Sequence, residues 1–199
     1  MTSDFTTDVL ICGAGAAGLT LAIDLARRGI SFRLIEKMDD GFRGSRGKGL
    51  QPRTLEIFED LGIVDRIVAA GGSYPPQREY TKGGAVTEAA VAEPEEPRTD
   101  VPFRAPLMIP QFLTEGVMRD RLAELGHRVE FGSELAGFEQ DDEGVTARLV
   151  GKAGEEVARA RYLVGADGGR SFVRHALGID FPHNPVRRRL CGIGFSRNW

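Results

Sequence analysis

Short apolar runs alternate with an amphipathic stretch at the start of the chain. Residues 8–13 form an apolar, β-branched run that is typical of a buried parallel strand. The apolar residues that follow recur at helical spacing, with Leu19 and Ile23 on one face and Gly29 as the expected C-cap. Residues 31–37, with Phe32, Leu34 and Ile35, predict a second strand. The pattern therefore predicts a strand, a helix and a second strand, which form a βαβ unit.

The middle of the chain is less regular. Residues 50–62 predict an amphipathic helix with Leu55 and Phe58 directed inward. Residues 71–110, in contrast, hold seven of the ten prolines, together with glycines and acidic residues, which is typical of loops or edge strands. This segment is either a disordered linker or the irregular wall of a pocket. We favour the wall, because residues 107–109 return to apolar character before the next helix.

The last regular pattern is a helix followed by three short strands. The helix is expected over residues 111–125, and turn-forming residues separate strands at 128–140, 144–150 and 156–164. This arrangement predicts an antiparallel β-meander. Its last strand is apolar at Tyr162, Leu163 and Val164, so we expect that strand to be buried before the chain turns sharply at Gly165.

Composition excludes several classes of protein. A chain of 199 residues with 41% hydrophobic and 28% charged residues is typical of a globular protein, and its net charge of −3 gives no reason to expect a nucleic acid partner. No apolar run approaches the length of a membrane span and the first residues do not resemble a secretion signal, so we expect no membrane and a cytoplasmic location. Two distant cysteines form neither a disulfide framework nor a zinc site. Neither a metal site nor a catalytic triad is supported by the spacing of the histidines, which are His127, His175 and His183.

Three glycines stand between the first predicted strand and the helix. In such a turn, Gly13 permits a tight bend, Gly15 lets the backbone approach a pyrophosphate, and Gly18 lets the helix and strand pack closely. The amides at the helix N-terminus are suited to bind a phosphate. Glu36 ends the second strand, where a carboxylate accepts hydrogen bonds from the hydroxyls of an adenosine ribose. Its charge disfavours the 2′-phosphate of NADP, which leaves NAD, FAD or a glycine turn without a ligand.

Four segments together resemble the flavoprotein aromatic hydroxylases. These are the single-component FAD monooxygenases related to para-hydroxybenzoate hydroxylase and to phenol or pentachlorophenol monooxygenases. The likeness lies in GAGAAGL with Glu36, and in SRGKGLQPRTLEIFEDLG, IPQFLTEGVMRDRLAELG and LVGADGGRSFVRHALGI, the last of which holds an Asp-Gly motif. The resemblance implies an α/β, Rossmann-like FAD-binding fold of the glutathione reductase type, with a βαβ unit and an antiparallel β-meander. It also favours FAD over NAD.

The resemblance implies a role for the first half of the site. The backbone of the glycine turn would hold the FAD pyrophosphate through residues Gly13, Ala14, Gly15, Ala16, Ala17 and Gly18. Glu36 would bind the ribose and Lys37 would border the adenosine. Arg46 matches an arginine that reaches the pyrophosphate region and later the nicotinamide cofactor, although arginines on loops are usually only solvated.

The remaining roles concern residues from the second half of the chain. Gln111 would form a hydrogen bond with the ribityl chain, and the backbone at Leu135 would border the adenine. Asp167 and Arg170 would serve both FAD and the transient NAD(P)H. Two of these residues have simpler interpretations, because Gln111 suits the start of a helix with its amide in water, and Asp167 suits a turn in which its side chain bonds the local backbone.

The resemblance also implies the chemistry. In the family, NAD(P)H reduces the flavin, O2 adds to form a C4a-hydroperoxide, and its terminal oxygen attacks the electron-rich ring of a small aromatic substrate. The protein orients the ring and excludes water. No side-chain nucleophile is required, so we assign no catalytic residue.

The order of the motifs predicts the domain organisation. Residues 1–199 are expected to form the N-terminal part of an FAD-binding domain, which divides into a βαβ unit at 1–70, an irregular, proline-rich segment at 71–110 that begins the substrate side, and a helix, meander and Asp-Gly motif at 111–180. The family has a further Gly-Asp motif downstream, and here the chain ends at CGIGFSRNW. We therefore expect a truncated reading frame or one piece of a split enzyme, completed by a C-terminal piece. The alternatives are a module that binds FAD or NAD without turnover and an NAD-dependent dehydrogenase.

Overall fold

One six-stranded sheet organises the protein. The computed structural model describes residues 5–45, 47–81, 83–91 and 101–182. Its elements are, in chain order, β1 (Thr7–Cys12), α1 (Ala16–Arg27), β2 (Phe32–Glu36), β3 (Gly49–Leu50), α2 (Pro52–Asp60), α3 (Val64–Ala70), β4 (Gly72–Ser73), β5 (Gln77–Tyr80), β6 (Val86–Ala89), β7 (Leu107–Met108), α4 (Gln111–Glu124), β8 (Glu130–Phe131), β9 (Glu134–Gln140), β10 (Val145–Gly151), β11 (Gly154–Gly165) and α5 (Phe172–Ala176).

Parallel and antiparallel strands share this sheet. Its strand order is β8-β2-β1-β11-β10-β9, in which the first four strands run parallel and β11, β10 and β9 form an antiparallel meander. Strand β11 joins the two parts, because its first half pairs with β10 and its second half, from Ala160 to Gly165, pairs with β1. The α/β fold with a βαβ unit and a meander is therefore confirmed.

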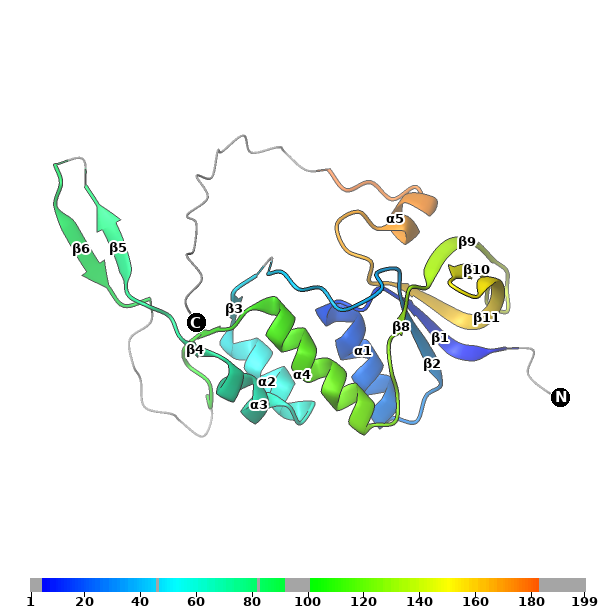
Figure 1. Cartoon of the computed structure of the whole chain (residues 1–199), viewed down its shortest axis with the longest axis horizontal. Helices are drawn as coiled ribbons and strands as arrows, with labels where there is room; N and C mark the ends of the chain where they lie inside the picture. Colours follow the sequence, from blue (N-terminus) through cyan, green and yellow to red (C-terminus); the bar gives the residue numbers. More distant parts are fainter. Residues whose placement is uncertain (1–4, 46, 82, 92–100, 183–199) are drawn as a thin grey trace.

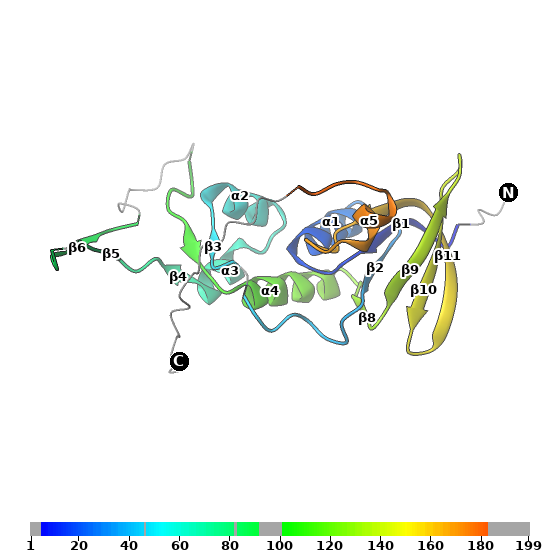
Figure 2. The ribbon, with the colours of Figure 1, turned by 90° about the horizontal axis from the view of Figure 1, so that it is seen from above.

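Helices cover one face of the sheet. The helices α1, α2, α3 and α4 lie together on one side, and α5 lies apart from them beside the ends of β1 and β11 (Figures 1 and 2). Ile11 of β1 packs on the helical side with Leu19 and Ile23 of α1. Leu10 points to the opposite face, where it packs with Val173 of α5. Strand β1 is apolar from Val9 to Cys12 because both of its faces are covered there.

The first correction concerns residues 128–140, which were expected to form one strand. Two strands form instead, with β8 parallel to β2 at one edge of the sheet and β9 antiparallel to β10 at the other edge. Gly132 has a φ of +69° between them, and the backbone amide of Ser133 donates to the carbonyl of Glu36 at 3.0 Å. The chain thus passes the end of β2 between its two pairings.

The second correction concerns β11, whose last residues were expected to be buried. Tyr162 is 66% exposed, whereas Ala158 and Ala160 are fully buried. The pairing with β10 ends at Ala160, which is opposite Val145. Beyond that residue, only β1 flanks the strand among the described residues. Tyr162 therefore faces solvent, whereas Leu163 and Val164 are partly buried and pack against the two hydrophobic cores.

The proline-rich segment contributes strands to two small sheets. Strands β3, β7 and β4 make one sheet, and Leu107 packs against the helical core. Strands β5 and β6 form a hairpin whose residues are all exposed, and which projects away from the rest of the protein (Figures 1 and 2). Residues 92–100 lie outside the described part. The interpretation as a pocket wall stays a prediction.

Truncation of Ile23 is expected to destabilise the protein. Its side chain is fully buried between α1 and the sheet, so Ile23→Ala removes packed atoms and leaves a cavity. We expect a loss of about 2–5 kcal/mol in the free energy of unfolding, measured by urea denaturation. Ile57→Ala is the matched control, because Ile57 is 43% exposed, and its cost should be about 1 kcal/mol or less. Equal losses for the two variants would contradict the described core.

Candidate functional site

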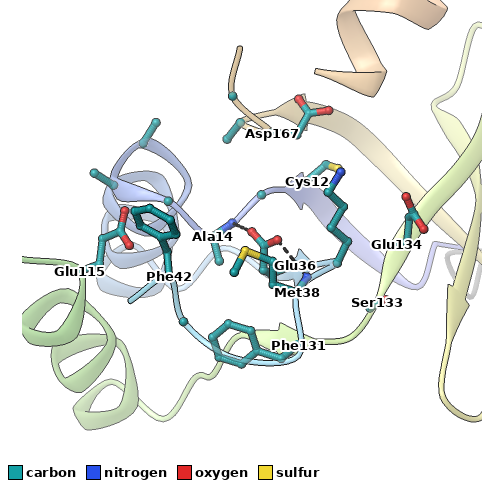
Figure 3. A pocket seen from close by; sticks show the side chains of 18 of the residues that line it. Cys12, Ala14, Glu36, Met38, Phe42, Glu115, Phe131, Ser133, Glu134 and Asp167 are labelled. Atoms are coloured by element: carbon teal, nitrogen blue, oxygen red, sulfur yellow. Dashed lines mark hydrogen bonds between the residues drawn. The ribbon is translucent and has the colours of Figure 1, made fainter. Parts of the chain in front are cut away.

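A cleft of about 340 Å³ opens at the carboxyl ends of the parallel strands. It is lined by the turn after β1, the end of β2 with the loop that follows, the start of α4 and the loop after β11 (Figure 3). Ligands of open α/β sheets bind at this edge, because the loops and helix N-termini converge there. Nearly all of the residues that the sequence predicts to bind the cofactor line this cleft.

Two of the three glycines are explained by the fold alone. A Cβ atom at Gly13 would lie 2.4 Å from the carbonyl oxygen of Ala166, and its φ of +106° also favours glycine. A Cβ atom at Gly18 would lie 1.9 Å from the carbonyl oxygen of Gly13. Close packing of strand, turn and helix therefore excludes any larger residue at these two positions. Neither glycine by itself indicates a ligand.

Gly15 differs from the other two glycines. Its φ is −75°, a value open to all residues, so a side chain here would not strain the backbone. A Cβ atom would meet only Oε1 of Glu115, at an ordinary contact distance of 3.7 Å. The fold does not require glycine at this position. Its bare backbone instead leaves space in the cleft in front of α1.

The N-terminus of α1 faces that space. Ala16 and Ala17 line the cleft, and the helix carries neither a side-chain cap nor an acidic residue in its first turn. The first amides of a helix lack intrahelical partners and stand at the positive end of its dipole. This end of α1 is therefore suited to bind an anion such as a phosphate.

Glu36 links the glycine turn to the end of β2. Its Oε2 accepts from the backbone amide of Ala14 at 3.0 Å, and its Oε1 accepts from the amide of Met38 at 3.1 Å (Figure 3). These bonds hold the carboxylate in the cleft. Each carboxylate oxygen has two acceptor positions, so the group retains capacity for ribose hydroxyls. Lys37 follows it in the cleft lining.

Asp167 has two different oxygens. Its Oδ2 accepts from the backbone amides of Phe172 at 2.6 Å and Val173 at 3.2 Å, which confirms that the side chain bonds the local backbone. Its Oδ1 is buried and has no hydrogen-bond partner within the described part of the chain. Leaving a buried acceptor without a partner costs about 1–3 kcal/mol. This atom, in the cleft lining, fits a ligand that donates a hydroxyl.

Gln111 does not leave its amide in water, as the simpler interpretation held. Its Nε2 donates to Oε1 of Glu115 at 2.7 Å, one helical turn along α4. Its backbone amide donates to the hydroxyl of Ser45 at 3.2 Å. The sequence analysis missed Glu115, although the spacing of four residues on one helix was visible. Only the tertiary structure shows that both side chains face the cleft.

The other predicted residues divide into three groups. Leu135 of β9 and Arg170 of the Asp-Gly loop line the cleft. Gly18 lies behind the turn, in the packing between helix and strand. Arg46 falls outside the described residues, so its role stays a prediction. The lining also includes four large apolar side chains that the sequence did not predict, namely Met38, Phe42, Phe131 and Phe172.

Cys12 lies at the base of the cleft. Its burial raises the pKa of its thiol to about 12, and the nearby carboxylates of Asp167 and Glu36 add to this rise. The thiol is therefore protonated at neutral pH. No group of three or more residues able to hold a metal ion occurs in the described ranges.

Comparison with known proteins identifies the family. The FAD binding domain family matches residues 6–197 of the chain. The chain belongs to this family. FAD is its cofactor, and the resemblance drawn from the sequence motifs is confirmed.

Relatives of this FAD-binding domain are monooxygenases. The chain is 43% identical over 195 residues to a flavin-dependent monooxygenase of Mycobacteroides abscessus, covering 95% of this chain and 41% of that protein. It is 37% identical over 180 residues to a rifampicin monooxygenase of Streptomyces venezuelae, covering 90% of this chain and 36% of that protein. The crystal structure of aklavinone-11 hydroxylase with FAD and aklavinone has a TM-score of 0.75 and 33% identity, covering 89% of this chain and 36% of that one.

The FAD-binding domain thus spans well under half of the length of these relatives, at 36–41%. Within the part that the structure describes, no helix has the length and apolar character needed to cross a membrane.

Cys12 is expected to resist alkylation. Because its pKa is raised from 9.0 to about 12, its thiolate fraction at pH 8 should be roughly a thousandfold lower than that of an ordinary cysteine. Iodoacetamide labelling of the Cys191→Ser variant, followed by mass spectrometry, measures this rate. The same variant unfolded in urea is the control and should be labelled rapidly. Rapid labelling of the folded protein would contradict the described burial of Cys12.

Proposed function

We propose that this FAD-binding domain holds the adenosine, pyrophosphate and ribityl parts of FAD in a monooxygenase that hydroxylates a small aromatic substrate with NAD(P)H and O2. The observation that carries the proposal is Gly15, where the fold allows a side chain and the sequence supplies none. A ligand that approaches the backbone explains this choice. The activity and substrate class rest on the names of relatives such as the rifampicin monooxygenase and the aklavinone hydroxylases.

The chemistry of the cleft residues fits the parts of FAD. The amides at the start of α1, beside Gly15, would bind the pyrophosphate. Glu36, fixed by the amides of Ala14 and Met38, would accept from the ribose hydroxyls. The unpartnered Oδ1 of Asp167 and the amide of Gln111 would receive the ribityl hydroxyls. Acceptors would thus meet hydroxyls, and backbone donors would meet phosphates.

The protein contributes binding, orientation and exclusion of water. When bound, FAD supplies the redox chemistry by which NAD(P)H and O2 are used. Asp167 and Arg170 line the cleft from the loop after β11. The resemblance assigns both residues to FAD and to the transient NAD(P)H. We assign no side chain as an acid, base or nucleophile, because the cofactor provides the reactive atoms.

A second candidate is an FAD-binding module without turnover. The observation that favours it is the lining of the cleft, whose residues fit the dinucleotide and include none of the described residues from 71 to 109. Residues that hold and shield the substrate would then have to come from another piece of protein. An NAD-dependent dehydrogenase is less well supported, because the chain leaves the parallel sheet for a meander and returns on β11 beside β1.

Replacement of Gly15 tests the proposed function. Gly15→Val places a branched side chain where the pyrophosphate would approach. The φ of −75° at this position is open to all residues, and a Cβ atom here meets only Oε1 of Glu115, at 3.7 Å. We expect the dissociation constant for FAD, measured by equilibrium dialysis, to rise more than about tenfold, a loss of 1.4 kcal/mol or more. The unfolding temperature of the variant should stay near that of the unaltered chain. The unaltered chain should also retain FAD better than NAD.

Gly72→Val is the matched control. Gly72 is exposed on β4, no atom lies within 4 Å of its Cβ position, and it does not line the cleft. Its FAD affinity should equal that of the unaltered chain. Unchanged FAD binding by a folded Gly15→Val protein, or tighter retention of NAD than of FAD, would show that the proposal is wrong.

Activity distinguishes the two candidate functions. Because a reactive oxygenating site must be shielded from water, the 199-residue chain alone should show no substrate-stimulated oxidation of NAD(P)H and no hydroxylated phenol by mass spectrometry. Co-expression with the remaining, C-terminal part of the Mycobacteroides relative should restore both. Hydroxylated product from the chain alone would contradict the need for a further piece. A complemented protein that binds FAD without turnover would favour the binding module.

A further inference from the structure

Glu115 is a buried carboxylate in the cleft. Its residue is only 2% exposed, and it is the one charged residue that is buried within the described ranges. Helix α4 places it one turn beyond Gln111, and both residues line the cleft. Burial of a charge is costly unless the group is paired and hydrogen-bonded. The position therefore calls for a specific role.

The partners of Glu115 lie on two sides. On its own helix, Oε1 accepts from Nε2 of Gln111 at 2.7 Å. Across the cleft, the same oxygen lies 3.7 Å from the Cβ position of Gly15, beside the positive end of α1. In Figure 3 its side chain extends from α4 toward the glycine turn. A helix N-terminus stabilises a nearby carboxylate, which accounts for part of the cost of burial.

The hydrogen bond decides which way the Gln111 amide is turned. A carboxylate offers only acceptors, so the nitrogen of the amide must face it. The amide oxygen then lies on the opposite branch of the planar group, and the second N–H bond of the nitrogen points away from Glu115. A neutral partner such as glutamine accepts or donates, so it would permit either orientation. The charge of Glu115 therefore favours the orientation in which the amide nitrogen faces it.

We propose that Glu115 is a positioning residue, which orients the amide of Gln111 for the polyol chain of the flavin. The inference rests on the proposed binding of FAD. A polyol chain offers hydroxyls that both donate and accept hydrogen bonds. An amide that is already held in one orientation binds these hydroxyls without the entropic cost of being ordered when the ligand arrives. The adenosine and pyrophosphate make no use of this amide. Glu115 thus contributes to the preference for a flavin over the nucleotide part alone.

The test compares two ligands, because a change of charge alone would affect both. FAD and ADP-ribose share the adenosine and pyrophosphate, and only FAD carries the ribityl chain. Glu115→Gln removes the charge at nearly constant volume. Glu115→Asp keeps the charge on a side chain that is one methylene shorter, which draws it back from Gln111. The measured quantity is the ratio of the two dissociation constants, obtained by isothermal titration calorimetry.

We expect both variants to lower the FAD preference about fivefold, the scale of one hydrogen bond. Both substitutions should have no effect on this ratio in a Gln111→Ala background, because the amide through which Glu115 acts is then missing. Glu124→Gln is the control, since Glu124 lies on the same helix and pairs with Arg66 at the surface. It should leave the ratio unchanged. The unfolding temperature of each variant shows whether it is folded. If Glu115→Gln does not fold, the test uses Glu115→Asp alone.

Three results would overturn the inference. The first is an unchanged ratio in both folded variants of Glu115. The second is a change in Glu115→Gln alone, which would indicate charge rather than orientation. The third is an equal effect of Glu115→Gln with and without Gln111. If the unaltered chain bound ADP-ribose but not FAD, the proposed function itself would fail, so the two failures are distinguishable.

Discussion

The close approach of two loops at the ends of β1 and β11 is the constraint on which the rest of this FAD-binding domain depends. The amide of Ala166 donates to the carbonyl of Cys12 at 2.7 Å, and the amide of Gly13 donates to the carbonyl of Ile35 at 2.8 Å. These bonds join three parallel strands at their carboxyl ends. Because Gly13 has no Cβ, the Asp-Gly loop comes within contact of the turn. The cleft forms where the loops that follow β1, β2 and β11 meet.

The electrostatics of the cleft follow from this meeting. The backbone amides of α1 provide a positive end. The lining around it carries five carboxylates, those of Glu36, Asp40, Glu115, Glu134 and Asp167, and two cationic side chains, those of Lys37 and Arg170. An anion alone would be a poor ligand for so many carboxylates. A molecule that combines phosphates with many hydroxyls suits them better, because the phosphates face amides and the hydroxyls face acceptors. FAD is such a molecule.

Several residues of the cleft serve the fold and the ligand together. Asp167 accepts from the first two amides of α5 with one oxygen and leaves the other without a partner among the described residues. Glu36 fixes the turn that it helps to build. Glu115 orients Gln111 from within the protein. Such double use keeps the binding groups rigid, because each is held by a bond that exists before the ligand arrives. It also means that substitution of Asp167 or Glu36 would disturb the local structure as well as binding.

The sequence by itself determined the elements whose signals are local. The period of apolar residues predicted β1, α1 and β2, and the glycine turn with Glu36 predicted a dinucleotide site, because turn geometry and helical faces depend on neighbours in the chain. Only the tertiary structure decided which strand β8 joins and that Tyr162 is exposed, since strand pairing is set by distant residues. Only the tertiary structure distinguished Gly15 from Gly13 and Gly18. At the latter two positions, backbone contacts across the turn leave no space for a Cβ atom. Likewise, the burial of Glu115 depends on the packing of α4 beside α1, which no spacing along α4 reveals.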